Sequence, residues 1–104
     1  MSEFQQTLYS IVQKIPSGTV ASYGQLALLA GKPRAARLVG TLMKNCPKDI
    51  DIPCHRVVKS DGSLCDANCL WSLVQQETLR AEGVPFLADG RVDIARCRWG
   101  GPER

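Results

Sequence analysis

The sequence has only one histidine, no Cys-x-x-Cys pair, and no hydrophobic run close to the ~20 residues that a membrane-spanning helix needs. Its first residues, MSEFQQ, lack the basic and then apolar pattern of a signal peptide. We therefore expect no membrane association, and a cytoplasmic protein, or a nuclear one if the organism is a eukaryote. Repeats and low-complexity segments are also absent, and 104 residues are enough for one domain with a single core.

The five cysteines form no familiar disulfide or metal-binding pattern. Their odd number, without a secretion signal, argues against a disulfide framework. The Cys65-x-x-x-Cys69 spacing is poor for half a zinc site, and adding Cys46, Cys54 and His55 completes no zinc pattern. We therefore expect no metal and no cofactor. The remaining cysteines are expected to be small, mostly reduced side chains: Cys46, Cys65, Cys69 and Cys97.

The charge of the chain is unevenly distributed. Residues 31–60 hold seven Lys or Arg against two Asp, a net charge of +5. Residues 61–90 hold one Arg against five acidic residues, a net charge of −4. A basic segment of this kind fits a polyanion such as DNA, although a solvated helix face would have the same composition.

The first segment, "EFQQTLYSIVQK" (3–14), predicts an amphipathic helix. Its apolar residues recur at helical spacing and form a single stripe: Phe4, Leu8, Ile11, Val12 and Ile15. Proline and glycine within residues 16–18 end this helix, and residues 19–21 are expected to be extended.

Two short helices are expected next, joined by a tight turn. Ser22 is a typical N-cap for a helix from Tyr23 to about Leu29, and residues 31–33 break that helix. A second helix begins at Arg34 or Ala35 and ends near Lys44. Its apolar face holds Leu38, Leu42 and Met43, and a smoother face holds Ala35, Ala36 and Gly40. The pair predicts a helix-turn-helix that presents Arg34, Arg37 and Lys44 to DNA, although two helices of an ordinary core would look similar.

The rest of the chain predicts one more helix and a hairpin. Residues 60–62 favour a turn, and Leu70–Glu82 favours a helix that ends before Gly83. Residues 84–87 and 91–94, joined at 88–90, favour a small hairpin, or wing, and Trp99 is expected to pack on the core. The expected fold is mainly α with a small β wing, a winged helix-turn-helix forming a single domain over residues 1–104. The inward residues expected for the late helix are Leu70, Leu73, Val74 and Leu79.

The stretch "IPCHRVV" (52–58) puts the single histidine directly after a cysteine. A cysteine attacks as its thiolate, and a free pKa of about 8.5 leaves only a few per cent ionised at pH 7, so a base is needed. Neighbouring strand residues point to opposite faces, so His55 can serve Cys54 only across a turn, which Pro53 favours, or through a water molecule. A carboxylate would have to orient the imidazole, and Glu82 and Asp61 are both candidates. The alternative is a core cysteine beside a surface imidazole.

The same stretch resembles the active-site motif of the O6-alkylguanine-DNA alkyltransferase family, in which Pro-Cys-His-Arg carries the alkyl-accepting cysteine. Two further stretches, "IPSGTVASYGQLALLAG" (15–31) and "PRAARLVGTLMKN" (33–45), are similar to its helix-turn-helix and recognition helix. The stretches "LRAEGV" and "GRVDIARCRW" also fit. The resemblance therefore covers nearly the whole chain, with these motifs in the same order.

The resemblance implies a role for each residue of the active-site motif. Cys54 would accept the alkyl group, His55 would be its water-linked base, and Glu82 would orient the imidazole. Pro53 and Arg56 would shape the turn, with Arg56 binding backbone carbonyls. Because transfer to sulfur is irreversible, each molecule would act once.

The resemblance also implies how DNA is bound. The partner would be double-stranded DNA containing O6-alkylguanine, bound in the minor groove by a monomer that turns the base out of the stack. Arg37 would fill the gap left by that base, and Tyr23 would push on the 3′ phosphate. Small Ala36 and Gly40 would let the helix approach the groove floor. We further expect Lys32 and Lys44 to contact phosphates, and Arg34 to be another DNA-binding residue.

The sequence departs from the enzymes of this family around the motif. Cys46, not the usual asparagine, precedes Pro47, and Asn45 lies one position early. Residues 64–70, "LCDANCL", replace a Gly-x-Tyr-x-x-Gly lid, and the usual additional N-terminal domain is not part of this sequence. In these respects the sequence resembles the alkyltransferase-like proteins, which bind O6-alkylguanine without transfer and recruit nucleotide excision repair. Those proteins normally have Trp or Ala in place of Cys54.

Two functions are therefore expected, in order of preference. The first is a single-turnover methylated-DNA–[protein]-cysteine S-methyltransferase that acts through Cys54. The alternative is a non-enzymatic lesion sensor with nucleotide excision repair proteins as partners. A plain transcription regulator would leave the active-site motif unexplained.

Overall fold

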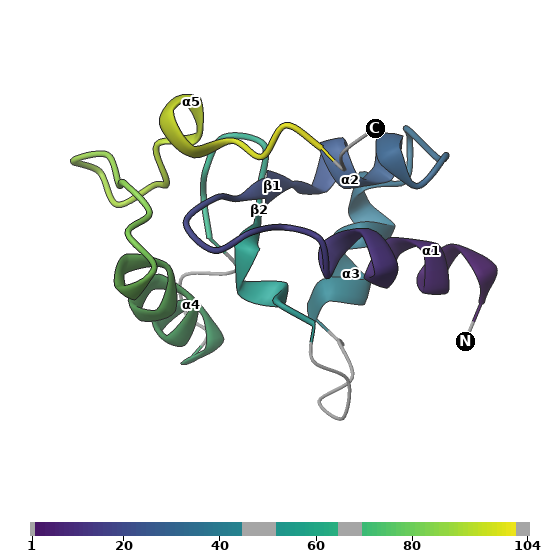
Figure 1. The fold of residues 1–104 in the computed structure, drawn as a ribbon, viewed down its shortest axis with the longest axis horizontal. Coiled ribbons are helices and arrows are strands. Elements are labelled where there is room, and N and C mark those ends of the chain that lie inside the picture. The colour runs from purple at the N-terminus through teal and green to yellow at the C-terminus, as the bar shows by residue number, and fades with distance from the viewer. Residues whose placement is uncertain (1, 45–51, 65–69, 102–104) are drawn as a thin grey trace.

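A computed structural model of the chain describes residues 2–44, 52–64 and 70–101. Its elements follow in the order α1 (Glu3–Val12), β1 (Ala21–Ser22), α2 (Tyr23–Leu29), α3 (Ala36–Lys44), a 3-10 turn (Cys54–Arg56), β2 (Val57–Val58), α4 (Leu70–Ala81) and α5 (Ile94–Cys97). Figure 1 shows α1, α2 and α3 gathered at one end and α4 at the other, with the two strands between them. The asparagine, cysteine and lid departures at 45–47 and 65–69 lie outside the described residues.

Helix α1 forms where the apolar stripe predicts it. Ser2 caps the helix, because its hydroxyl accepts from the backbone N–H of Gln5 and the Gln5 side chain accepts from the Ser2 N–H. The helix ends at Val12, two residues before the predicted end, because the N–H groups of Lys14 and Ile15 bond i→i−3 and tighten the turn that follows. The stripe is buried, apart from the half-buried Phe4: Leu8, Ile11, Val12 and Ile15.

Helices α2 and α3 are the predicted helix pair and pack against each other. Ser22 caps α2 as predicted, because its hydroxyl accepts from the backbone N–H of Gln25 at 3.1 Å. Helix α3 buries Val39 and Met43, whereas the predicted core residue Leu38 is 44% exposed. The prediction was wrong there because the face that meets the core is centred on the i, i+4 pair of Val39 and Met43.

Two short parallel strands, β1 and β2, bring the segment around residues 54–58 next to the helix pair. Ala21 pairs with Val57 and Ser22 with Val58, so the 54–56 turn lies beside the start of α2. The C-terminal segment also joins here, because the Trp99 N–H donates to the Val20 carbonyl at 2.8 Å. Trp99 is buried as predicted.

Helix α4 turns a different face to the core from the one the sequence predicts. Leu79 is buried as expected, but Leu73 and Val74 are more than half exposed and Gln75 is buried instead. The inward face contains residues 75, 79 and 82, at i, i+4 and i+7, because that face meets the 54–58 segment. The side chain of Leu70 lies outside the described part.

The predicted hairpin is present in a reduced form. A single antiparallel bridge pairs Phe86 with Val92, and residues 94–97 form α5 where the second strand was expected to end. This small wing lies at the α4 end of the molecule, where Val84 and Val92 pack with Leu79 (Figure 1). The winged helix-turn-helix fold in a single domain is confirmed. Within the described residues, no helix combines the length and the apolar character needed to cross a bilayer.

Candidate active site and DNA-binding surface

The stretch from Ile52 to Val57 folds as a compact turn. The Cys54 N–H donates to the Ile52 carbonyl at 2.8 Å, and the Arg56 N–H donates to the Pro53 carbonyl at 3.0 Å. The Val57 N–H closes the turn on the Cys54 carbonyl. The turn expected at Pro53 is therefore present, and Cys54 and His55 do not alternate across a strand.

Cys54 is buried, with 8% of its surface exposed, in a core cluster shared with α1, α2 and α3. Its sulfur is in a disulfide in this structure. The sequence argued against a disulfide framework, and Cys54 departs from that expectation. An odd cysteine count argues against a paired framework, but it does not prevent folding from bringing one pair together.

Cys97 has a free thiol, as predicted. Its Sγ donates to the Asp93 carbonyl at 3.3 Å, and burial raises the pKa of this thiol above its usual value, with Asp93 adding to the shift. Cys97 is therefore poorly suited to be a nucleophile. Three of the cysteines considered for a zinc site, Cys46, Cys65 and Cys69, lie outside the described residues.

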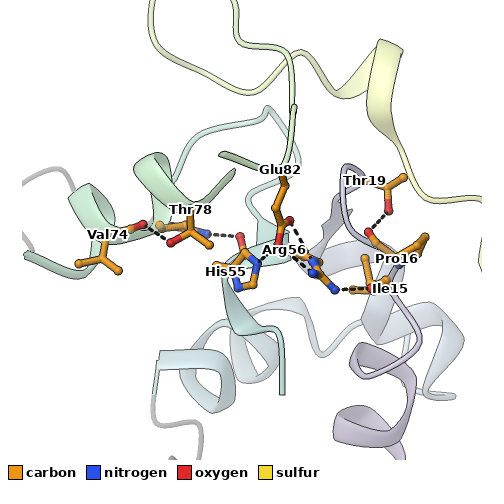
Figure 2. A network of polar contacts seen from close by, with 9 residues as sticks. Ile15, Pro16, Thr19, His55, Arg56, Val74, Thr78 and Glu82 are labelled. Atoms are coloured by element: carbon orange, nitrogen blue, oxygen red, sulfur yellow. Dashed lines mark hydrogen bonds and ion pairs between the residues drawn. The ribbon is translucent and has the colours of Figure 1, made fainter. Parts of the chain in front are cut away.

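Glu82 is the carboxylate that reaches the histidine. Its Oε2 atom lies 2.8 Å from Nε2 of His55, in a part-buried contact between the end of α4 and the turn (Figure 2). Asp61, the other candidate, accepts instead from the Ser63 N–H at 2.9 Å. With Nε2 bound to the carboxylate, Nδ1 is the ring nitrogen left to take part in proton transfer.

Arg56 holds the same carboxylate from the other side. Its Nε donates to Oε1 of Glu82 at 3.0 Å and its Nη2 donates to Oε2 at 2.7 Å, while Nη1 donates to the Ile15 carbonyl at 2.8 Å (Figure 2). Arg56 therefore binds one backbone carbonyl, as predicted, and also forms a bidentate ion pair, which the sequence did not predict. The Arg56 hydrogen bonds, together with His55, hold the pKa of Glu82 at about 2, although burial opposes that shift.

The position of Glu82 follows from the way α4 ends. Gly83 has φ +87°, and its N–H donates to the Arg80 carbonyl while the Val84 N–H donates to the Leu79 carbonyl. This pair of bonds is a Schellman motif with Gly83 just after the helix, as the sequence predicts. Glu82 is therefore fixed at the cap position, where the chain leaves the helix and faces the 54–56 turn.

A basic strip runs along the outer side of α3. Arg37, Thr41 and Lys44 are exposed on one helical face, and Arg34 is exposed just before the helix begins. Residues 31–44 contain no acidic side chain. Lys32, which was expected to contact phosphate, lies over the Phe4 ring, 5.0 Å from its centroid. The strip is the part of this helix that could accept a polyanion.

Tyr23 and Gly40 are brought together between α2 and α3. A Cβ atom on Gly40 would lie 3.3 Å from the Tyr23 ring, so the missing side chain leaves room for that ring. Gly40 thus has a packing role that the sequence did not indicate, because its small size was attributed only to the approach of the helix to DNA. Ala36 is half-buried at the start of α3.

Sequence reasoning also missed Gln75. Its buried side chain donates from Nε2 to the carbonyls of His55, at 3.1 Å, and Val57, at 3.0 Å. The available signal was its spacing, because residues 75, 79 and 82 share one helical face with Leu79 and Glu82.

The comparison with known families agrees with this arrangement. The model of the DNA-binding domain of 6-O-methylguanine DNA methyltransferase matches residues 3–84. The chain belongs to this family. The matched region runs from α1 to just beyond α4, so it includes both the 54–56 turn and Glu82.

Individual relatives include proteins named as methyltransferases and proteins named for base flipping. The chain is 41% identical over 102 residues to the DNA base-flipping protein of Escherichia coli, covering 92% of this chain and 74% of that one. It is 42% identical over 81 residues to the methylated-DNA–protein-cysteine methyltransferase of Rattus norvegicus, covering 78% of this chain but only 39% of the enzyme.

A solved structure resembles the whole domain. The structure of S. pombe Atl1 in complex with damaged DNA containing O6-carboxymethylguanine matches with a TM-score of 0.83 and 32% identity. The match covers 95% of this chain and 96% of Atl1. The family and the fold are thus shown, and the choice between transfer and binding rests on the residues of the site.

Proposed function

We propose that the reduced protein is a single-turnover methylated-DNA–[protein]-cysteine S-methyltransferase that removes alkyl groups from O6-alkylguanine in double-stranded DNA. The observation that carries this proposal is the arrangement of Cys54 and His55 on one turn, with Nε2 of His55 held 2.8 Å from Glu82. A sulfur nucleophile, a base beside it and a carboxylate behind the base form the set that cysteine chemistry requires.

DNA binding is assigned to the basic strip on α3. Arg34, Arg37 and Lys44 would face phosphates and the groove, and Arg37 would fill the gap left by the extruded guanine. Tyr23, seated against Gly40, would push on the 3′ phosphate. Because Cys54 is 92% buried, a guanine within the base stack cannot reach its sulfur, and the base has to be turned out into the protein.

The chemistry is a displacement at carbon. The Cys54 proton passes through a water molecule to Nδ1 of His55, while the Nε2–H of His55 continues to donate to Glu82. The thiolate then attacks the alkyl carbon, and the sulfur–carbon bond forms as the bond from carbon to O6 breaks. The departing guanine takes up one proton, so the net change moves the thiol proton to guanine and leaves an S-alkyl cysteine.

A lesion sensor is the second candidate, and it is favoured by one observation. The match to S. pombe Atl1 extends over nearly all of both chains, whereas the rat enzyme is more than twice the length of the matched region. In that function, the protein would bind O6-alkylguanine, leave Cys54 unchanged, and present the site to nucleotide excision repair proteins. In either function it would act as a monomer, in the cytoplasm or in a nucleus.

The two candidates are separated by mass spectrometry. Reduced protein is incubated with a duplex containing one O6-methylguanine, and the intact protein and its peptides are weighed. We expect one added methyl group on the peptide that holds Cys54, and none in Cys54→Ala, which should still shift the lesion duplex on a gel. Wild-type protein that binds the lesion duplex and gains no mass would be a sensor.

A further inference from the structure

Among the described residues, Gln75 is the one buried residue with an amide or charged side chain, and only 1% of its surface is exposed. Its Nε2 donates to the carbonyl oxygens of His55 and Val57, which lie on either side of Arg56. A buried amide costs free energy unless its hydrogen bonds are made, and an apolar side chain would fill the same volume without that cost. We therefore take the two hydrogen bonds, and not the filling of volume, as the role of this amide.

These bonds supply partners for two carbonyls that the active-site turn does not satisfy by its own backbone bonds. The carbonyls of Ile52, Pro53 and Cys54 accept from backbone N–H groups within the turn itself. The His55 carbonyl accepts from α4, through Gln75, across a separation of 20 residues. The backbone at His55 is thus fixed by a different element from the one that carries it.

The same helix also fixes the imidazole of His55. Gln75 and Glu82 are seven residues apart, so they lie on one face of α4 about two turns from each other. Gln75 binds the main chain of His55, and Glu82 binds its Nε2. One rigid helix therefore sets both the position of the backbone and the orientation of the ring, which decides where Nδ1 lies relative to Cys54.

We propose that Gln75 is a positioning residue for the Cys54–His55 pair, acting through the His55 carbonyl. This inference rests on the proposed function, in which His55 accepts the Cys54 proton. Without the Gln75 donors, Arg56 still binds Glu82, but the carbonyls of His55 and Val57 lose their hydrogen bonds to α4, so the imidazole is no longer held in a single orientation against Glu82. Proton transfer through one water depends closely on geometry, so a small movement of the turn weakens the base.

The test uses Gln75→Met, which keeps the volume and removes both N–H donors. The matched control is Gln76→Met, the same substitution at the next, half-buried position of α4. Reduced, folded protein is treated with iodoacetamide over a range of pH, and Cys54 modification is followed by peptide mapping. We expect Gln75→Met to slow modification at neutral pH by about tenfold and to move the pH profile toward that of a thiol without a base.

A spectroscopic readout is available because His55 is the only histidine. The ¹⁵N shifts of its ring report which nitrogen carries the proton. The wild type and Gln76→Met are expected to hold the Nε2–H form, whereas Gln75→Met is expected to show a mixture. Gln75→Asn, which keeps an amide but shortens its reach, takes the place of Gln75→Met if that variant does not fold, with the same expectations.

The outcomes separate this inference from the proposed function. A less stable Gln75→Met with the wild-type rate, pH profile and ring signals would reduce Gln75 to a packing role and overturn the inference. Absence of methyl transfer by the wild type would overturn the proposed function. The iodoacetamide profile and the ring signals would then still decide whether Gln75 positions His55.

Discussion

Nε2 of His55 and Oε2 of Glu82 lie 2.8 Å apart, although 27 residues separate them in the sequence. The same carboxylate receives two hydrogen bonds from Arg56, so one acidic group orients the imidazole and ties the active-site turn to α4. The base and the packing of the turn are therefore coupled through Glu82, and changes at this residue affect both stability and reactivity.

Alkyl transfer should require reduction of Cys54, because a sulfur in a disulfide cannot attack carbon. Protein treated with a thiol reductant is expected to take up one methyl group from an O6-methylguanine duplex. Protein oxidised beforehand is expected to take up none until it is reduced again. Mass spectrometry under both conditions checks this, and equal transfer by the two forms would exclude a role for the disulfide.

The ion pair at Glu82 should stabilise the protein at neutral pH and stop doing so in acid. The carboxyl has a folded pKa of about 2 and an ordinary value of 4.5, so its contribution is complete above about pH 5 and is lost as the pH falls toward 2. Glu82→Gln is expected to lower the free energy of unfolding by at most about 3 kcal/mol at pH 7. Denaturant titrations at several pH values should show that difference shrinking in acid. Glu77→Gln, on the exposed side of α4, is the control and should show no such trend.

Arg37→Ala should weaken binding to damaged and undamaged duplexes alike, by about tenfold, because the arginine is expected to stabilise the opened base stack. Fluorescence anisotropy with matched duplexes measures the two affinities. Arg80→Ala removes the same charge from α4, on a side chain that packs over the Phe86 ring, and should leave DNA affinity nearly unchanged. Wild-type affinity in Arg37→Ala would show that α3 is not the recognition helix.

Lys44→Ala should flatten the dependence of DNA affinity on salt. Lys44 is exposed in the last turn of α3, on the face shared with Arg37, where a phosphate contact is expected. Losing one such contact should reduce the slope of log K against log salt by about 1. Binding isotherms from low to moderate salt test this, and an unchanged slope would place Lys44 away from the DNA backbone.

Gly40→Ala should weaken DNA binding while changing stability little. The added Cβ would lie 3.3 Å from the Tyr23 ring, so the ring has to shift by a few tenths of an ångström, and we expect a loss of about 1 kcal/mol in binding, roughly fivefold in Kd. The better helix propensity of alanine, up to about 1 kcal/mol, offsets the close contact in the folded protein. Thermal unfolding and DNA titrations give the two numbers, and unchanged DNA affinity would separate Tyr23 from base extrusion.

Much of this protein was determined by short-range patterns in its sequence. The caps at Ser2 and Ser22, the stop at Gly83 and the apolar stripe of α1 depend on neighbours within one or two helical turns, so they can be predicted without a fold. The turn at Pro53 is local in the same sense. Such local signals predicted the helix pair, the small wing and the turn that carries Cys54 and His55.

The tertiary structure decided the features that join distant segments. It selected Glu82 over Asp61 as the partner of His55, and it put Gln75, not Leu73 or Val74, on the inner face of α4. It also seated Tyr23 on Gly40. The reason is physical. Which face of a helix is buried, and which carboxylate reaches an imidazole, depends on how whole elements pack, and residues on different elements carry no mutual spacing signal in the chain.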